Sequence, residues 1–273
     1  MDVSRTVSLN NGGSIPVLGL GVWTGMDPEA QRGSLEWLHT AIKAGYRHFD
    51  TALIYGASLF VLNFRESGLC LLRHGSSIVC RWNHHARIVE SLNESLENLG
   101  TDYVDLYLMH WPQYVVYEKD NWIPRNPDGT VRVTEERNFN QSWEVMEKLL
   151  ETGKCKAIGV SNFSIKTLEK LFTTAKIIPA VNQIELHPYL VQEDLVQYCH
   201  GKGIAVVAYT PTGTEVVRKD PVIIELAEKY NATPTQVVLA WHLLRGVVAV
   251  PKSANEDRQK ENMKLPVLEP EDV

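Results

Sequence analysis

The 273-residue chain has no apolar run close to the roughly 20 residues that a membrane-spanning helix needs. Its first residues, Met1–Thr6, lack the apolar core of a secretory signal peptide. Lysine and arginine (27) are fewer than aspartate and glutamate (33), and the net charge of −6 argues against a nucleic-acid surface or an acidic membrane as partner. These absences predict a cytoplasmic protein that binds neither nucleic acid nor a membrane.

Cysteine is scarce, and the four present (Cys70, Cys80, Cys155 and Cys199) lack the spacing of metal ligands. In a chain of this size they predict reduced thiols in a cytosolic protein. A metal site at His84-His85 is the one alternative. Adjacent histidines do not converge on one ion, however, and no carboxylate is spaced to join them, so no metal is expected.

Lysine is missing over a long stretch, since none occurs between Lys43 and Lys119. Within this stretch, residues 57–81 contain a single acid, Glu66, and two of the four cysteines. They lack a clean helical pattern, and an asparagine and a glycine interrupt the apolar positions. We therefore predict that residues 57–81 are irregular or poorly packed, except that Ser77–Cys80 is apolar enough to form a strand.

Short apolar runs alternate with helical patterns along the rest of the chain. Strands are predicted at Val17–Gly21, Arg47–Thr51, Ser77–Cys80, Val104–His110, Ala157–Ser161, Ala180–Ile184, Ala205–Tyr209 and Val247–Pro251. Helices are predicted at Pro28–Ala44, Ile88–Leu99, Gln141–Thr152, Ser164–Ala175, Gln192–Gly201, Pro221–Tyr230 and Thr233–Leu244. This alternation predicts an α/β protein, specifically one parallel (β/α)8 barrel domain over residues 1–273, with Gln113–Asn138 as a long loop at its functional end.

Polar side chains follow most of the predicted strands. They are Asp50, His110, Ser161, Asn162, Gln183, Tyr209, Lys252 and Ser253. Because the carboxyl ends of barrel strands meet on one face, we expect these groups to surround one active site. The run Ser77–Cys80 ends without such a group.

Each polar residue also has a structural interpretation when it is taken alone. Asp50 could cap a turn, His110 could be a hydrogen-bonded core histidine, and Asn162 could cap the next helix. Tyr55, in the loop after the second strand, could be a rim aromatic. Together they indicate carbonyl chemistry, because a phenol can donate a proton to a carbonyl oxygen that an imidazole orients.

The segment after the last strand has the chemistry of a phosphate site. Lys252, Ser253 and Arg258 suit a phosphate monoester at the mouth of the eighth strand. The alternative is the solvated, charged start of a helix.

A doubly wound dinucleotide-binding sheet is the rival architecture. Gly19, Gly21 and Gly25 loosely imitate its glycine fingerprint, and Asp50 lies near the distance expected of a ribose-binding acid. Trp23 interrupts the pattern, however, and a proline precedes any helix.

Five stretches carry a family resemblance over nearly the whole chain. They are Gly45–Ala52 (GYRHFDTA), Asp102–Pro112 ending in MHWP, Gly159–Phe163 (GVSNF), Asn182–Tyr189 (NQIELHPY) and Pro251–Ser253 (PKS). On these residues the chain resembles the aldo-keto reductases, among them the fungal NADPH-dependent aldehyde and sugar reductases and glycerol dehydrogenases.

The resemblance implies a barrel that binds extended NADPH and reduces small carbonyl compounds, or oxidises polyols, as a monomer or weak dimer. It implies Tyr55 as general acid, assisted by His110 and by Asp50 paired with a lysine. It further implies that Trp23 and Trp111 line the substrate pocket. The implied cofactor-binding residues are Ser161, Asn162 and Gln183 at the carboxamide, Tyr209 on the nicotinamide, Lys252, Ser253 and Arg258 at the 2′-phosphate, and Asn262 at the adenine.

The sequence departs from the family at two places. The catalytic lysine should stand at Val79 or Cys80, and a misread frame or mis-spliced exon would explain why residues 57–81 keep their length but lose identity. The chain also stops just after Leu268–Asp272, where the family continues with a final helix and a tail. Two functions follow: an NADP-dependent alcohol dehydrogenase or carbonyl reductase, or a catalytically impaired NADPH-binding protein or product of a defective gene model.

Overall fold

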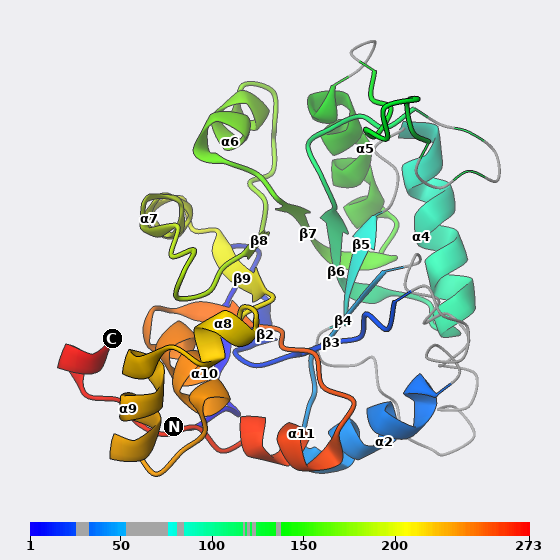
Figure 1. Cartoon of the computed structure of the whole chain (residues 1–273). Coiled ribbons are helices and arrows are strands. Elements are labelled where there is room, and N and C mark those ends of the chain that lie inside the picture. The colour runs from blue at the N-terminus through cyan, green and yellow to red at the C-terminus, as the bar shows by residue number, and fades with distance from the viewer. Residues whose placement is uncertain are drawn as a thin grey trace.

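A computed structural model describes most of the chain (Figure 1). The described residues are 1–25, 33–52, 76–80, 85–116, 118, 121, 124–134 and 138–273.

Eight parallel strands form the centre of the molecule. They are β3 (Leu20–Gly21), β4 (Phe49–Ala52), β5 (Ser76–Cys80), β6 (Val104–Met109), β7 (Cys155–Ser161), β8 (Val181–Glu185), β9 (Ala205–Tyr209) and β10 (Val247–Ala249). Their order in the sheet follows their order in the chain, from β3 to β10. A parallel bridge joins Leu18 to Ala249, and Gly21 donates a backbone hydrogen bond of 3.0 Å to Pro251. The two edges of the sheet therefore meet, and the predicted (β/α)8 architecture is confirmed.

The doubly wound alternative is wrong, because the strand order does not reverse within the sheet. Two of its glycines serve the closure of the barrel instead. A Cβ on Gly19 would lie 2.6 Å from His48 Nδ1 and 2.9 Å from a methyl of Val250, and one on Gly21 would lie 3.1 Å from the Val250 carbonyl oxygen. Glycine at these positions allows the first and last strands to approach each other.

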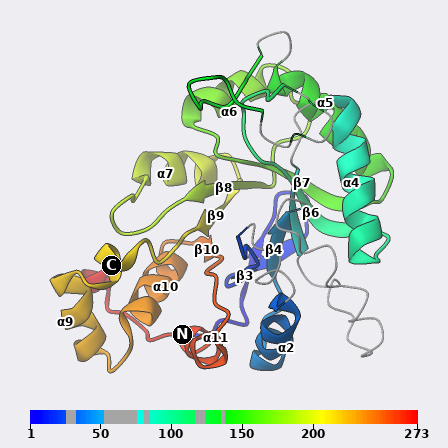
Figure 2. The same ribbon diagram turned by 45° about the vertical axis from the view of Figure 1, so that its right-hand side comes forward.

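Helices surround the strands in both views (Figures 1 and 2). They are α2 (Ser34–Ala44), α4 (His85–Leu99), α5 (Phe139–Glu151), α6 (Ile165–Phe172), α7 (Glu193–Gly201), α8 (Glu215–Arg218), α9 (Pro221–Lys229), α10 (Pro234–Leu244) and α11 (Glu256–Asn262). Each predicted helix is present, although α2 begins at Ser34 and residues 28–32 lie outside the described part of the chain. Helix α8 and the short 3-10 helix Pro270–Asp272 were not predicted, whereas α11 lies where the alternative for Lys252 to Arg258 expected a charged helix start.

Local sequence explains where several helices begin and end. Thr233 forms a capping box with Gln236 at the start of α10, where Pro234 occupies the first turn. Gly45 ends α2 with a φ of 110°, a left-handed conformation that glycine adopts without strain.

Alternate strand residues divide the core into an inner and an outer part. Leu106 and Leu108 of β6 belong to the cluster inside the barrel, whereas Tyr107 and Met109 pack outward beneath α4 and α5. This division is the two-residue period of a strand that is buried on both faces. Gly159 faces inward because a Cβ there would lie 2.6 Å from Leu108.

An unpredicted hairpin covers the amino end of the barrel. Its strands β1 (Thr6–Ser8) and β2 (Ser14–Pro16) pair antiparallel. Leu9 and Ile15 pack within the inner cluster, and Asn10 Nδ2 donates 3.0 Å to the carbonyl of Pro179, which precedes β8. The hairpin thus closes the amino end of the barrel.

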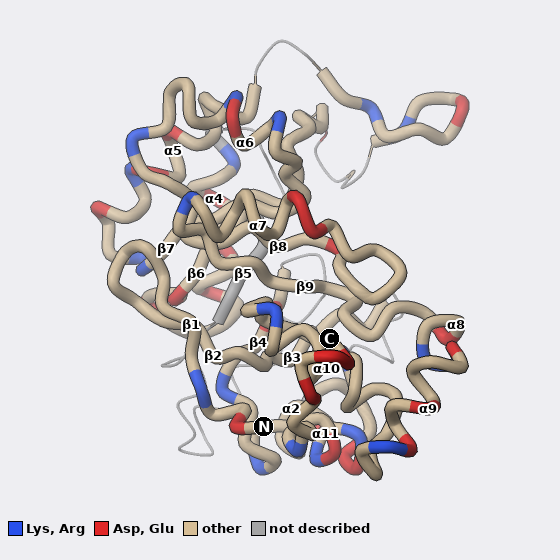
Figure 3. Tube along the Cα trace, turned by 90° about the vertical axis from the view of Figure 1, so that its left-hand side faces the viewer, with Lys and Arg blue, Asp and Glu red and all other residues tan. Residues whose placement is uncertain are grey.

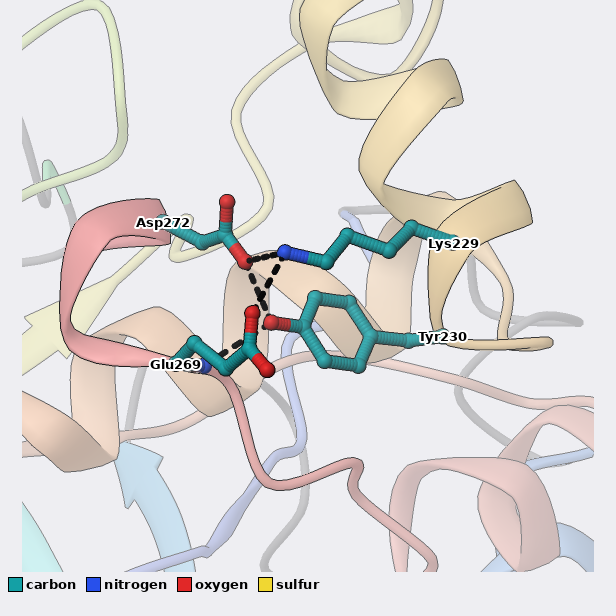
Figure 4. A network of polar contacts seen from close by, with 4 residues as sticks. All are labelled: Lys229, Tyr230, Glu269 and Asp272. Atoms are coloured by element: carbon teal, nitrogen blue, oxygen red, sulfur yellow. Dashed lines mark hydrogen bonds and ion pairs between the residues drawn. The ribbon is translucent and has the colours of Figure 1, made fainter.

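The last residues of the chain attach to the outside of the barrel. Leu265 and Leu268 pack in the outer cluster with α2 and α10. Lys229 Nζ donates 2.7 Å hydrogen bonds to both Glu269 and Asp272, and the hydroxyl of Tyr230 donates to Asp272 (Figure 4). This network fixes the segment after α11 against the end of α9.

The insertion after β6, predicted as a loop, contains local pairing in its described part. Val115 bridges antiparallel to Val133, and Arg125 bridges to Val131. Within the described residues, no helix is long and apolar enough to cross a bilayer.

Candidate active site

A pocket of about 580 Å³ opens at the carboxyl ends of the strands. Nine of the predicted groups surround it from different strands. They are Trp23, Asp50, His110, Trp111, Ser161, Asn162, Gln183, Tyr209 and Lys252. The site therefore lies on the face at which (β/α)8 barrels place their chemistry.

Asn162 is the centre of a hydrogen-bond network at the ends of β6, β7 and β9. Its φ of 63° is left-handed, which is costly for most residues and less so for asparagine. Its Nδ2 donates 2.9 Å to the His110 carbonyl oxygen, and its Oδ1 accepts 2.9 Å from the Tyr209 hydroxyl. The network holds the Asn162 and Tyr209 side chains and the His110 backbone in fixed positions relative to one another. The cap of α6 is Ser164, not Asn162, so the interpretation of Asn162 as a helix cap is wrong.

Asp50 and Gln183 connect opposite sides of the pocket. Both are buried, and Gln183 Nε2 donates 3.0 Å to Asp50 Oδ1. Asp50 is two residues before Ala52, which belongs to the inner cluster, so it faces into the barrel. Ser161 Oγ donates 2.8 Å to the Gln183 carbonyl oxygen and fixes the backbone at that position. No described residue donates to Gln183 Oε1, which leaves an acceptor for an amide N–H.

Burial sets the protonation of the two ring side chains at the pocket. It lowers the pKa of His110 to about 4, so the imidazole is neutral at pH 7. Burial and the carboxylate of Glu185 raise the pKa of Tyr209, and its phenol stays protonated. The site thus offers neutral hydrogen-bonding groups at its base.

The segment after β10 carries two cations, of which Lys252 lines the pocket. Lys252 and Arg258 are exposed, and neither forms a salt bridge with any acid in the described chain. Ser253 is buried, and its Oγ donates 3.2 Å to the Asn255 carbonyl oxygen. Asn255 caps α11 by accepting 2.9 Å from Arg258 N. The predicted phosphate residues therefore lie at the start of one short helix.

Helix α11 is anchored to the barrel through Gln259. Its Nε2 donates 2.8 Å to the carbonyls of both Trp37 and Ser253. Asn262, the last residue of α11, is buried rather than open at the surface. Its expected role at an adenine ring stays a prediction.

Several predicted features fall outside the described residues. Tyr55 is one of them, as are residues 57–75 and Arg81. The strand expected at Ser77–Cys80 is present as β5, and its backbone register is defined. Val79 pairs with Ala52 and Leu108 of the inner cluster, whereas Cys80 pairs with Met109 of the outer one. The backbone register therefore aligns position 79 with two residues of the inner cluster, which is the alignment that a catalytic lysine would need.

Sequence reasoning missed Arg218 and the loop before it, which also line the pocket. Thr210, Pro211, Thr212 and Gly213 follow Tyr209 directly. Arg218 Nη1 donates 3.1 Å to the Gly213 carbonyl oxygen, and Gly213 has a φ of 57°. Arg218 could have been found from the sequence, because it is a basic residue that follows soon after a predicted strand ending at the site.

Comparison with known proteins places this geometry in a family. Residues 17–273 match the model of the aldo/keto reductase family. The chain is 41% identical to glycerol 2-dehydrogenase (NADP(+)) of Saccharomyces cerevisiae over 99% of its own length and 89% of the relative's. It is 42% identical to aldehyde reductase YPR1 of the same yeast, over 98% and 88%. It is 36% identical to aldo-keto reductase family 1 member A1 of Mus musculus, over 96% and 84%. The protein belongs to the aldo/keto reductase family.

Proposed function

We propose that this protein is an NADP(H)-dependent oxidoreductase that reduces aldehydes, ketones or sugars to alcohols and runs the reverse oxidation. The yeast relatives are named as a glycerol dehydrogenase that uses NADP(+) and as an aldehyde reductase. The names of these relatives support both the proposed cofactor and the proposed class of substrate.

One observation carries the proposal: amide-binding groups and an unpaired cation share a single pocket. Gln183 Oε1 is a free acceptor for a carboxamide, and Tyr209 offers a ring at the adjoining strand end. Lys252 lies on the same pocket. An amide, a planar ring and a phosphate are the recognition elements of a nicotinamide dinucleotide phosphate, so the residues present fit this cofactor.

The chemistry divides between the cofactor and the side chains of the pocket. Bound NADPH supplies the hydride. Tyr55 is assigned as the general acid that protonates the carbonyl oxygen, and neutral His110 donates a hydrogen bond that orients the same oxygen. Trp23 and Trp111, which are 42% and 44% exposed, offer apolar walls to the substrate.

The test is a titration of the purified chain with NADPH and NADH, followed by turnover on a panel of aldehydes and polyols. We expect NADPH to bind more tightly than NADH, and Y55F to retain binding while turnover falls. Absence of NADPH binding would refute the proposal.

A second candidate, a cofactor-binding protein with impaired turnover, rests on the missing lysine. Valine occupies position 79 of β5, which pairs with Ala52, and no lysine lies between positions 43 and 119. A tyrosine with a pKa near its usual value of about 10 keeps its proton but transfers it poorly without a neighbouring cation. NADPH binding without turnover would favour this candidate, and resequencing of the transcript would test whether residues 57–81 are a misread frame.

A further inference from the structure

Helix α11 has no apolar side chain with which to pack on the barrel. Each of its seven residues (EDRQKEN) is polar or charged, and Gln259 and Asn262 are the two that are buried. The helix lies beside α2 (Figures 1 and 3). Because a helix of this length is not stable by itself, its contacts with the barrel decide where it lies.

Gln259 uses both polar atoms of its side chain to join α11 to two other segments. Its Nε2 donates 2.8 Å to the carbonyl oxygen of Trp37 in α2 and 2.8 Å to that of Ser253. Its Oε1 accepts a 2.6 Å hydrogen bond from the hydroxyl of Thr40, which also belongs to α2. The residue is fully buried. A buried amide that lost these partners would be destabilising, so the contacts specify one position for it.

These contacts hold the segment that carries the residues proposed for the 2′-phosphate. Gln259 binds the backbone of Ser253 directly, and Arg258 precedes it in α11. Between them, Asn255 accepts 2.9 Å from the backbone N–H of Arg258 and so fixes the shape of the turn. Gln259 then sets the position of this turn relative to α2.

The carboxyl end of α11 has an anchor of its own. Gln236 of α10 donates 3.0 Å to the carbonyl oxygen of Glu261 and 2.5 Å to that of Lys264. Gln236 and Gln259 thus each bind two backbone carbonyls, but at opposite ends of the same helix. The two ends can therefore be loosened separately.

We propose that Gln259 is a positioning residue through which this protein distinguishes NADPH from NADH. The proposal rests on the proposed function and adds to it a side chain that is too deeply buried to contact the ligand. Charge-assisted contacts depend on geometry, and the groups that form them must be held within about 0.5 Å by the residues behind them. Gln259 supplies this support to Ser253 and Arg258, because it fixes their backbone against α2.

The test measures the dissociation constants of NADPH, NADH and 2′-AMP by quenching of tryptophan fluorescence, without turnover. Q259M replaces the amide with an apolar side chain of similar length, and T40V removes only the hydroxyl that donates to Gln259. Q236M is the matched control, because it makes the same substitution at the other anchor of the helix. Urea unfolding of each variant measures the loss of stability separately.

We expect Q259M to weaken NADPH and 2′-AMP about tenfold, as the loss of one charge-assisted contact predicts, and to change NADH by less than about twofold. T40V should shift binding in the same direction by about threefold, because one neutral hydrogen bond is lost. Q236M should lower the free energy of unfolding without changing the ratio of the NADH and NADPH dissociation constants. A purely structural role for Gln259 would leave that ratio unchanged as well.

Four results would overturn the inference and leave NADPH binding, and with it the proposed function, intact. They are equal weakening of NADPH and NADH by Q259M, no weakening of NADPH by Q259M, equal binding of the two nucleotides by the unmodified chain, and a change of the ratio in Q236M as large as in Q259M. The last would mean that any loosening of α11 suffices.

If Q259M does not fold, T40V decides, and an unchanged ratio in that variant overturns the inference. If the unmodified chain binds no NADPH, the proposed function itself fails.

Discussion

Two edges of the same pocket differ in how many of the residues predicted from the family resemblance they contain. The edge formed by β7 to β10 has the amides of Asn162 and Gln183, the Tyr209 ring and Lys252, and hydrogen bonds hold the two amides in place. The edge formed by β4 and β5 has Asp50, but position 79, which pairs with Ala52, holds a valine in place of the family's lysine. If the proposed function holds, cofactor binding and proton transfer depend on separate parts of the barrel, and one could be retained while the other is lost.

Restoring a lysine on β5 should have the largest effect. V79K should raise turnover by about 10²–10⁴-fold, which is the usual contribution of an acid–base group. The measurement is kcat on an aldehyde at saturating NADPH. C80K is the matched control and should raise it much less, because Cys80 pairs with Met109 of the outer core.

Turnover of the unmodified chain at ordinary enzyme rates would contradict the view that the β4–β5 edge lacks a group needed for proton transfer. If R81A then abolished them, an arginine would have taken the role of the lysine.

Removing a cation at the cofactor edge should have the next largest effect. R258A should weaken NADPH binding about tenfold or more and spare NADH, because only NADPH carries the 2′-phosphate. Direct titration of both nucleotides measures it. Equal losses for the two would show that Arg258 does not recognise that phosphate.

The hydrogen bond from Gln183 to Asp50, which joins the two edges, should contribute measurably to the free energy of unfolding. Q183L removes the donor to buried Asp50 and should lower the free energy of unfolding by about 1–3 kcal/mol. Urea denaturation measures the loss. D50N with Q183L should be less unstable than Q183L alone, because it removes the buried charge to which Gln183 donated its hydrogen bond. No rescue would place the partner of Asp50 elsewhere.

The smallest effect concerns pH. His110 is half-buried, and this desolvation lowers the pKa of its ring to about 4, below the roughly 6.5 of an unfolded chain. Between pH 6.5 and 4 the unfolded state therefore binds more protons at His110 than the folded state does. The free energy of unfolding falls as the pH is lowered through this range. H110N should lose less stability than the unmodified chain between pH 7 and 5, by about 1–2 kcal/mol. The measurement is the free energy of unfolding in urea at each pH. An equal pH dependence in H110N and the unmodified chain would show that the folded state does not lower the pKa of His110.

Periodicity predicted the elements well where apolar runs are long. The run Ala205–Tyr209 is a strand over the same residues in the structure, and Thr233-Pro234 begins a helix as its capping pattern requires. The four-residue helix α8 was missed, since it is too short for a helical period to show. The hairpin of β1 and β2 was missed because its three-residue strands are also too short, and one of their positions is occupied by proline.

The sequence by itself determined the alternation of strand and helix, the family, and which polar residues follow each strand. These properties are local, because they depend on side-chain period, caps and short stretches of identity. Tertiary structure alone decided that Gly19 and Gly21 close a barrel, that Gln183 bonds Asp50 across 133 positions of chain, and that Arg218 shares a pocket with Lys252. Each of these depends on which segments meet once the sheet curves on itself, and no window of sequence contains both partners.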